Sequence, residues 1–206
     1  MERVSTNIRM LDHHLGGGIP AGSITALVSP PASQVNPLFY ALMGERSWLY
    51  LSTYRSERAV SDELEDLLWG EVEIEHLGVE RPARRMHEAL QAADEERHVI
   101  VDTMNPMEKI SHESRYVDLL NGLKDYLLDS DRVAVCHCTR HGDPPPLRES
   151  TLTVADMVLK LDTTVEKQGI ENTLVVPKHR SREAIEEVIK LDLGGEAAVD
   201  ASRNVA

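Results

Sequence analysis

Two groups of residues in the sequence have side chains that could do chemistry, and the first is a cluster of cysteines and histidines. Cys136, His137 and Cys138 are consecutive, and His141 follows closely. A structural zinc site usually has four ligands, and about two to four residues separate its paired cysteines. Here a single residue separates the chain's two cysteines, so His112 or His141 would have to complete a site. The spacing favours buried cysteines at a strand end over a zinc enzyme or a cysteine–histidine nucleophile.

The second group is charged. Asp102 ends a short apolar run, and a carboxylate there could hold a Mg²⁺-bound water or could cap the following loop. Lys178 and Arg180 lie in a basic turn that could reach a phosphate or could be solvated surface. Asn36 followed by Pro37 is typical of a helix start. Such a start could offer N–H groups to an anion, although a capped helix behind a rigid loop is the simpler interpretation.

The elements that must position these residues follow from hydrophobic periodicity. Apolar runs in the first part of the chain predict strands at residues 23–28, 48–52, 99–102 and 132–138. Helical spacing predicts helices at residues 6–15, 36–44, 56–68, 82–96 and 116–128. After a loop at 142–146, the pattern predicts consecutive strands at residues 157–161, 172–176, 188–193 and 197–199.

This order predicts an α/β fold with a mostly parallel sheet, helices on both faces and a C-terminal antiparallel extension. Ligand sites in such sheets lie at the carboxyl ends of the strands, so the informative residues follow Val28, Ser52, Val101 and Val135. The length of 206 residues predicts one domain. We divide it into a lead-in helix and glycine turn (1–22), an α/β core (23–163) and a C-terminal β extension (164–206).

Composition limits the function classes. The chain has 22 lysines and arginines against 35 acids, a net charge of −13, which argues against a basic nucleic-acid surface and against binding to anionic lipid. The N-terminal residues have no apolar segment like that of a signal peptide, and no apolar run reaches the roughly 20 residues of a membrane span. Two cysteines that are separated by a single residue cannot form a disulfide that links distant segments of the chain. We therefore expect a reduced, cytoplasmic protein.

Most of the cations are arginines, and lysines are scarce. An acid-rich, lysine-poor surface resembles those of salt-adapted archaeal proteins, and we expect a halophilic, archaeal source; an ordinary acidic protein is the alternative. At molar salt the screening length shrinks to about 3 Å, so the negative charge would repel DNA less than it otherwise would.

The landmarks along the chain resemble the RecA/RadA recombinase and KaiC-like ATPase family. In that family a short helix, a glycine-rich turn and a G-I-P-x-G-S segment precede the first core strand. This chain has Gly16-Gly17-Gly18-Ile19-Pro20-Ala21-Gly22-Ser23 at that place. Residues 99–102 resemble the Walker B strand, with Asp102 at its acidic position, and residues 154–161, 177–181, 193–195 and 199–203 resemble later landmarks. The resemblance implies a RecA-like core with a phosphate loop after the first strand.

The phosphate loop departs from the family pattern G-x-x-x-x-G-K-[ST], in which glycines and a lysine surround the phosphates. Aligned to the strand at 23–28, the loop has Ser29 and Gln34 at the glycine positions, Val35 at the lysine position, Asn36 at the hydroxyl position, and Ala32 and Ser33 between them. Three prolines, at 30, 31 and 37, lack backbone donors. We therefore expect a degenerate Walker A motif.

The end of the second strand departs as well. Family ATPases usually place an acid there to position the attacking water, whereas this chain has Tyr54 and Arg55, with Glu57 as the nearest acid. We interpret Glu63 and its acidic neighbours as a solvated helix face. The family's basic turn, here Lys178 and Arg180, often reaches the γ-phosphate of a neighbouring subunit, which makes these residues possible trans fingers.

These departures favour a pseudo-ATPase: a RecA/KaiC-like domain that does not hydrolyse ATP and acts as a regulatory or scaffolding subunit in a signalling or DNA-repair assembly. We expect no cofactor, with ATP and Mg²⁺ as the alternative, and a homo- or hetero-oligomer with RecA/KaiC-like proteins. Direct DNA binding and membrane binding are not expected. The alternatives are an atypical but active ATPase and an accessory DNA recombination or repair factor.

Overall fold

The computed structural model describes residues 2–65, 70–93, 97–166, 169–180, 185–193 and 198–199. Its helices are α1 (Arg9–Leu15), α2 (Asn36–Met43), α3 (Glu57–Leu64), α4 (Pro82–Ala92), α5 (Glu113–Ser130) and α6 (Arg148–Val154), with a 3₁₀ turn, η1 (Met107–Lys109). Its strands are β1 (Arg3–Val4), β2 (Ile19–Pro20), β3 (Ser23–Ser29), β4 (Trp48–Ser52), β5 (Val72–His76), β6 (His98–Asp102), β7 (Val133–Thr139), β8 (Met157–Glu166), β9 (Gly169–His179), β10 (Ile185–Asp192) and β11 (Ala198–Val199).

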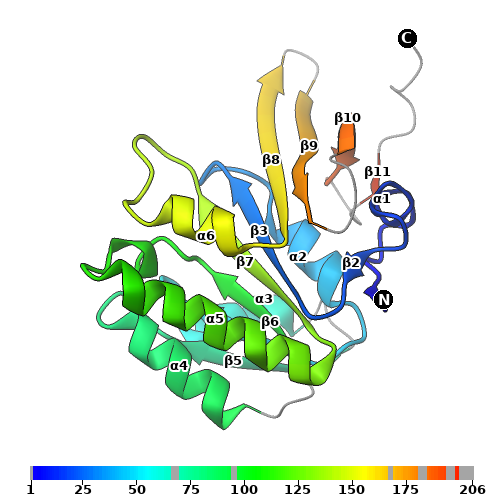
Figure 1. The fold of residues 1–206 in the computed structure, drawn as a ribbon. Helices are drawn as coiled ribbons and strands as arrows, with labels where there is room; N and C mark the ends of the chain where they lie inside the picture. Colours follow the sequence, from blue (N-terminus) through cyan, green and yellow to red (C-terminus); the bar gives the residue numbers. More distant parts are fainter. Residues whose placement is uncertain are drawn as a thin grey trace.

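One large sheet organises the fold, with the strand order β11-β10-β9-β8-β3-β7-β6-β4-β5. The strands from β8 to β5 in this order run parallel, whereas β9, β10 and β11 pair antiparallel at the other end. The long β8–β9 hairpin rises away from the helices (Figure 1). The predicted α/β class, with a mostly parallel sheet and a C-terminal antiparallel extension, is therefore confirmed.

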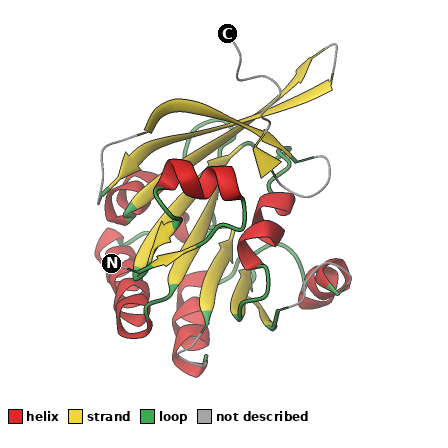
Figure 2. Cartoon of the chain, turned by 90° about the vertical axis from the view of Figure 1, so that its right-hand side faces the viewer, coloured by secondary structure: helices red, strands yellow, loops and turns green. Residues whose placement is uncertain are grey.

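Helices cover both faces of the parallel part of the sheet (Figure 2). Alternate residues of each central strand point to opposite faces and divide the core in two. Leu27, Tyr50 and Ile100 belong to the cluster packed by α1, α2 and α3. Their neighbours Val28 and Val101 belong to the cluster packed by α4, α5 and η1. Strands buried on both faces explain why the central runs read as continuously apolar.

Local sequence explains where several helices begin and end. Ser56 is the N-cap of α3, and its side chain accepts a hydrogen bond from the Ala59 N–H. Helix α1 ends at Gly16, which adopts the left-handed conformation that glycine tolerates best. Gly18 has a φ of +112°, and a Cβ there would lie 2.3 Å from the Val4 carbonyl oxygen, so the pairing of β1 with β2 requires a glycine.

Some elements differ from the sequence expectations. The pattern did not predict β5, whose alternating charged residues hide its strand character, nor the short helix α6, nor the small β1–β2 pair. Helix α2 has Val35, not Asn36, as its N-cap. Parts of the expectations at 66–68, 94–96, 181, 194–195, 197 and 200–203 lie outside the described residues, and the division of the chain at 22 and 163 stays a prediction.

Within the described ranges, none of the helices combines the length and the apolar character that crossing a membrane requires.

Candidate functional site

The candidate site lies at the carboxyl ends of the central parallel strands. Ser29 at the end of β3 is in register with Thr139 at the end of β7. Asp102 at the end of β6 is in register with His137 of β7 on one side and with Ser52 of β4 on the other. The topology therefore brings Ser29 and Asp102, which are far apart in the sequence, to one edge of the sheet, as the strand-end argument predicted.

A chain of hydrogen bonds joins the strand ends. The Ser33 hydroxyl donates to the Ser29 hydroxyl at 2.9 Å, and Ser29 Oγ lies 2.9 Å from His137 Nε2. His137 Nδ1 lies 2.7 Å from Asp102 Oδ1, and the Tyr50 hydroxyl donates to Asp102 Oδ2 at 2.7 Å. With Nδ1 protonated, each donor finds an acceptor along the whole path, and each Asp102 oxygen accepts one hydrogen bond.

The electrostatics set the protonation of Asp102 and of Tyr50. Burial raises the pKa of the Asp102 carboxyl, but hydrogen bonds from His137 and Tyr50 and nearby positive charge outweigh burial, and the net pKa lies below its ordinary value. Burial and the adjacent Asp102 charge raise the pKa of the Tyr50 hydroxyl far above its ordinary value. At neutral pH, Asp102 is therefore a carboxylate acceptor and Tyr50 a protonated donor.

The connectivity Ser29–His137–Asp102 is that of a serine-hydrolase triad, in which a histidine held by an acid takes the proton of a serine. Access decides what it can do here. Ser29 is fully buried, His137 is 4% exposed, and the Phe39 ring stands edge-on to the His137 ring at 5.5 Å between centroids. No acyl substrate can reach a serine in this position, so in this conformation the chain of side chains is a buried support for the sheet edge.

The residues predicted at the phosphate loop divide into buried and outer positions. Ala32 is exposed and Ser33 and Gln34 are half-buried, with Gln34 Oε1 accepting from Asn172 of β9 at 3.0 Å. Val35 is 8% exposed and belongs to the hydrophobic core. The loop thus turns the side chain of Val35, which stands at the lysine position of the motif, into the protein. A lysine ammonium at this place would be desolvated.

An acid that the sequence analysis assigned to a solvated face lies beside this loop. Glu63 of α3 accepts hydrogen bonds from Asn36 Nδ2 at 2.8 Å and from the Tyr40 hydroxyl, and it pairs with Arg55. The interpretation of Glu63 as solvated surface was therefore wrong, because α3 turns this side chain toward α2. Asn36, at the hydroxyl position of the motif, is held by Glu63 and does not cap α2.

This donor set does not match what magnesium triphosphate needs. A phosphate cradle needs converging backbone N–H groups and a cation, and Mg²⁺ needs free oxygen ligands. Here prolines interrupt the loop, Val35 is turned into the core, and both Asp102 oxygens accept hydrogen bonds from this chain. The Asn36 side chain donates a hydrogen bond to the Glu63 carboxylate, so these two side chains are already engaged with each other.

The basic turn lies at the other end of the parallel strands, near the start of β3. Lys178 Nζ donates to the carbonyls of Leu152 and Thr153 at 2.8 Å, and Arg180 pairs with Asp156 at 3.2 Å. The lysine contacts cap the last turn of α6. Asp156 also accepts from the Ile24 N–H at the start of β3, so Lys178 and Arg180 are not brought together with Ser29 or Asp102 of the same chain.

The cysteines belong to the core below α5. Cys136 and Cys138 are fully buried, and burial together with the charge of Glu108 raises the pKa of the Cys136 thiol to about 12. In the described part of the chain, no group of three or more histidines, cysteines and acids could hold a metal ion. Glu108 instead forms a bidentate ion pair with Arg148 of α6, at 2.7 to 2.9 Å, inside the protein.

Sequence reasoning missed the residues that complete the strand-end chain. His137 was weighed only with its cysteine neighbours, although its place on a strand beside the Asp102 strand could have indicated the pair. Nothing in the sequence marked Tyr50, a residue inside an apolar run, as the second partner of Asp102. Phe39, the chain's one phenylalanine, was not singled out either, although its ring lies against His137.

Comparison with known proteins agrees with the fold. The KaiC-like protein PH0186 from the hyperthermophilic archaeon Pyrococcus horikoshii OT3 superposes with a TM-score of 0.72 and 16% identity over 97% of this chain and 99% of that one. The RadB recombinase superposes with a TM-score of 0.70 and 19% identity over 95% and 98%. No curated protein is significantly similar in sequence. The fold is thus that of the RecA-like proteins, and the chain itself belongs to the family of unknown function DUF7125, whose model matches residues 3–206.

Proposed function

We propose that this chain is a RecA-like domain that does not hydrolyse ATP and that serves as a regulatory or scaffolding subunit beside a competent relative. The observation that supports this most is the state of Asp102. Its two carboxylate oxygens, which would hold a Mg²⁺-bound water in an active relative, accept from His137 and Tyr50 at 2.7 Å.

The energetics point the same way. A lysine contact to phosphate contributes about 1.5–3 kcal/mol, and its stabilisation of the transition state is larger. Freeing Asp102 for a metal would leave the buried His137 and Tyr50 without their acceptor, at a further cost of about 1–3 kcal/mol each. Restoring one element of the site alone would therefore not restore turnover.

A scaffolding role needs only the fold of the RecA-like proteins, and the chain retains this fold. The sheet and helices superpose over nearly the full length of two RecA-like proteins. We propose that the chain docks on a RecA/KaiC-like partner through the surface by which this fold assembles. Lys178 and Arg180 act in trans in this proposal only if docking releases them from the α6 carbonyls.

The test compares hydrolysis by the purified chain with that by a RecA-like protein that has an intact phosphate loop, both assayed with Mg·ATP at molar and at low salt. We expect no turnover above the buffer background, and no change on Asp102→Asn substitution. A pull-down from the source cells at native salt should recover a RecA-like ATPase. Turnover that disappears in the Asp102→Asn variant would overturn the proposal.

A further inference from the structure

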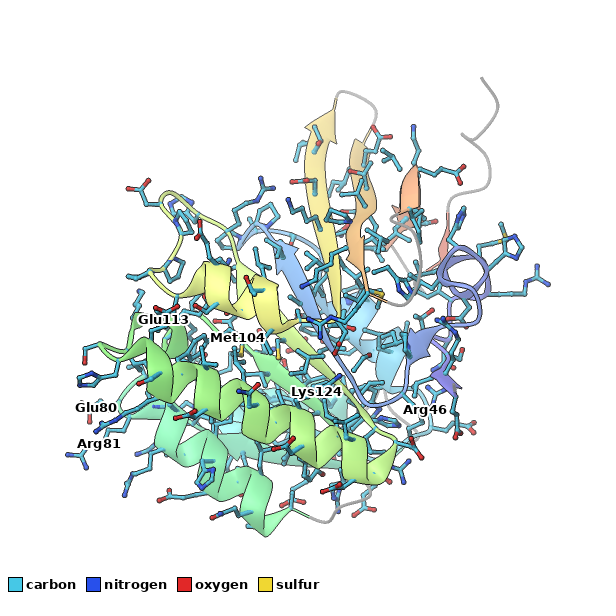
Figure 3. The ribbon with its side chains drawn as sticks, in the orientation of Figure 1. Arg46, Glu80, Arg81, Met104, Glu113 and Lys124 are labelled. Atoms are coloured by element: carbon cyan, nitrogen blue, oxygen red, sulfur yellow. The ribbon has the colours of Figure 1, made fainter. Side chains whose placement is uncertain are left out.

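A groove between α4 and α5 is lined by cations, which is unusual on a protein of net charge −13. It has a volume of about 480 Å³. Arg81 and Arg84 come from the start of α4 and Arg115 from the first turn of α5. The starts of both helices lie at the same end of their layer, where Figure 3 labels Arg81 and Glu113.

The arginines at the groove are available for a ligand. Within the described residues, neither Arg81 nor Arg115 makes an ion pair or a side-chain hydrogen bond, and Arg84 makes only an exposed contact of 3.6 Å with Glu88. Asp118 is the one acid among the described lining residues. Glu113 lies nearby, but its carboxylate accepts from Ser150 Oγ at 2.9 Å on the α6 side. Three arginines against one acid give the lining of the groove an excess of positive charge.

Part of the lining is apolar. Ala83, Ile110 and Leu119 line the groove together with the arginines, and Leu119 is part of the core cluster. A volume of this size is typical of small-molecule sites, in which an apolar surface buries a ring and a few polar groups fix its orientation. Arginine is suited to phosphate because its planar fork donates two parallel hydrogen bonds.

We propose that this groove binds a nucleoside phosphate, with the ring against Ala83, Ile110 and Leu119 and the phosphate between Arg84 and Arg115. The first turn of α5 has no side-chain cap, so its backbone N–H groups add partial positive charge, which also favours a phosphate. This site is separate from the strand-end site of Ser29 and Asp102, and it needs no Mg²⁺ and no terminal phosphates.

The experiment titrates the full chain with AMP in the absence of Mg²⁺ and follows binding by calorimetry. We expect saturable binding, weaker binding of inorganic phosphate and of adenosine alone, and an affinity that falls as salt rises. Arg84→Ala and Arg115→Ala should each lower the affinity at least about tenfold. Alanine is the best helix former, so these variants should fold. Arg58→Ala is the matched control, because Arg58 is an exposed α3 arginine outside the groove.

Two results would overturn the proposal. One is the absence of AMP binding at millimolar concentration; if a single-stranded oligonucleotide binds in its place, the groove is a nucleic-acid surface. The other is AMP binding that Arg84→Ala and Arg115→Ala leave unchanged. Either result can be told from a failure of the proposed function, because that proposal is tested by turnover of Mg·ATP and by Asp102→Asn.

Discussion

His137 holds the Asp102 carboxylate by a hydrogen bond of 2.7 Å between Nδ1 and Oδ1, across neighbouring strands whose ends are in register. The acid at the Walker B position is thereby a structural acceptor, because Tyr50 takes its other oxygen. A partly buried carboxylate with two protein donors contributes to stability, whereas a catalytic acid held ready for a metal often costs stability.

Replacing this acceptor should therefore destabilise the protein. Asp102→Ala leaves the His137 N–H and the Tyr50 O–H buried without an acceptor, and we expect the free energy of unfolding to fall by about 2–4 kcal/mol. Denaturant unfolding at constant salt measures it. Asp62→Ala, on the exposed face of α3, is the control and should change stability by less than about 0.5 kcal/mol. Equal stability of the Asp102 variant and the wild type would contradict the structural role.

Stability should also decline on mild acidification because of His98. This residue is 3% exposed, its Nδ1 accepts from the Val133 N–H at 3.2 Å, and its ring packs on Trp48. Burial and the charges of Arg132 and Arg46 lower the pKa of His98 to about 4.

The unfolded chain binds a proton at this histidine below a pH of about 6.5, whereas the folded chain does not until about pH 4. Stability contributed by neutral His98 is thus complete above pH 6.5 and is lost as pH falls toward 4, by about 2 kcal/mol at pH 5. Chemical unfolding at pH 7 and pH 5 tests this, and His98→Gln should reduce the difference. A wild-type stability that is unchanged between the two pH values would refute the assignment.

The sequence predicted most of the fold because burial on both sheet faces leaves continuous apolar runs, as at β4 and β6. It missed β5 because an edge strand of alternating charge lacks that signal. The site was predicted in part: Ser29 and Asp102 follow from strand ends, since topology brings those ends together. The Glu63 contact with Asn36 depends on the rotation of α3 against α2, which the periodicity of α3 alone does not determine.

The buried pair of Glu108 and Arg148 offers a third prediction. Glu108 is fully buried and also accepts from Thr151 at 2.6 Å, so Arg148→Met would leave an uncompensated charge in the core. We expect the free energy of unfolding to fall by about 3–5 kcal/mol. The double variant Glu108→Leu with Arg148→Met removes both charges and should recover much of this loss. A double-mutant cycle measures the coupling, and additive effects would show that the pair does not interact in this way.

The last prediction concerns Ser29, whose hydroxyl is 2.9 Å from His137 Nε2. If this triad were a working nucleophile, a fluorophosphonate probe would label Ser29, because such probes report a serine activated by a base within reach of solvent. Full burial of Ser29 and the Phe39 ring against His137 exclude the probe. We expect intact-mass measurement to show no more labelling than in the Ser29→Ala variant. That variant should also lose about 1–3 kcal/mol of stability, because His137 Nε2 loses its donor. Stoichiometric labelling of the wild type alone would mean that the strand-end site opens and that Ser29 acts as a nucleophile.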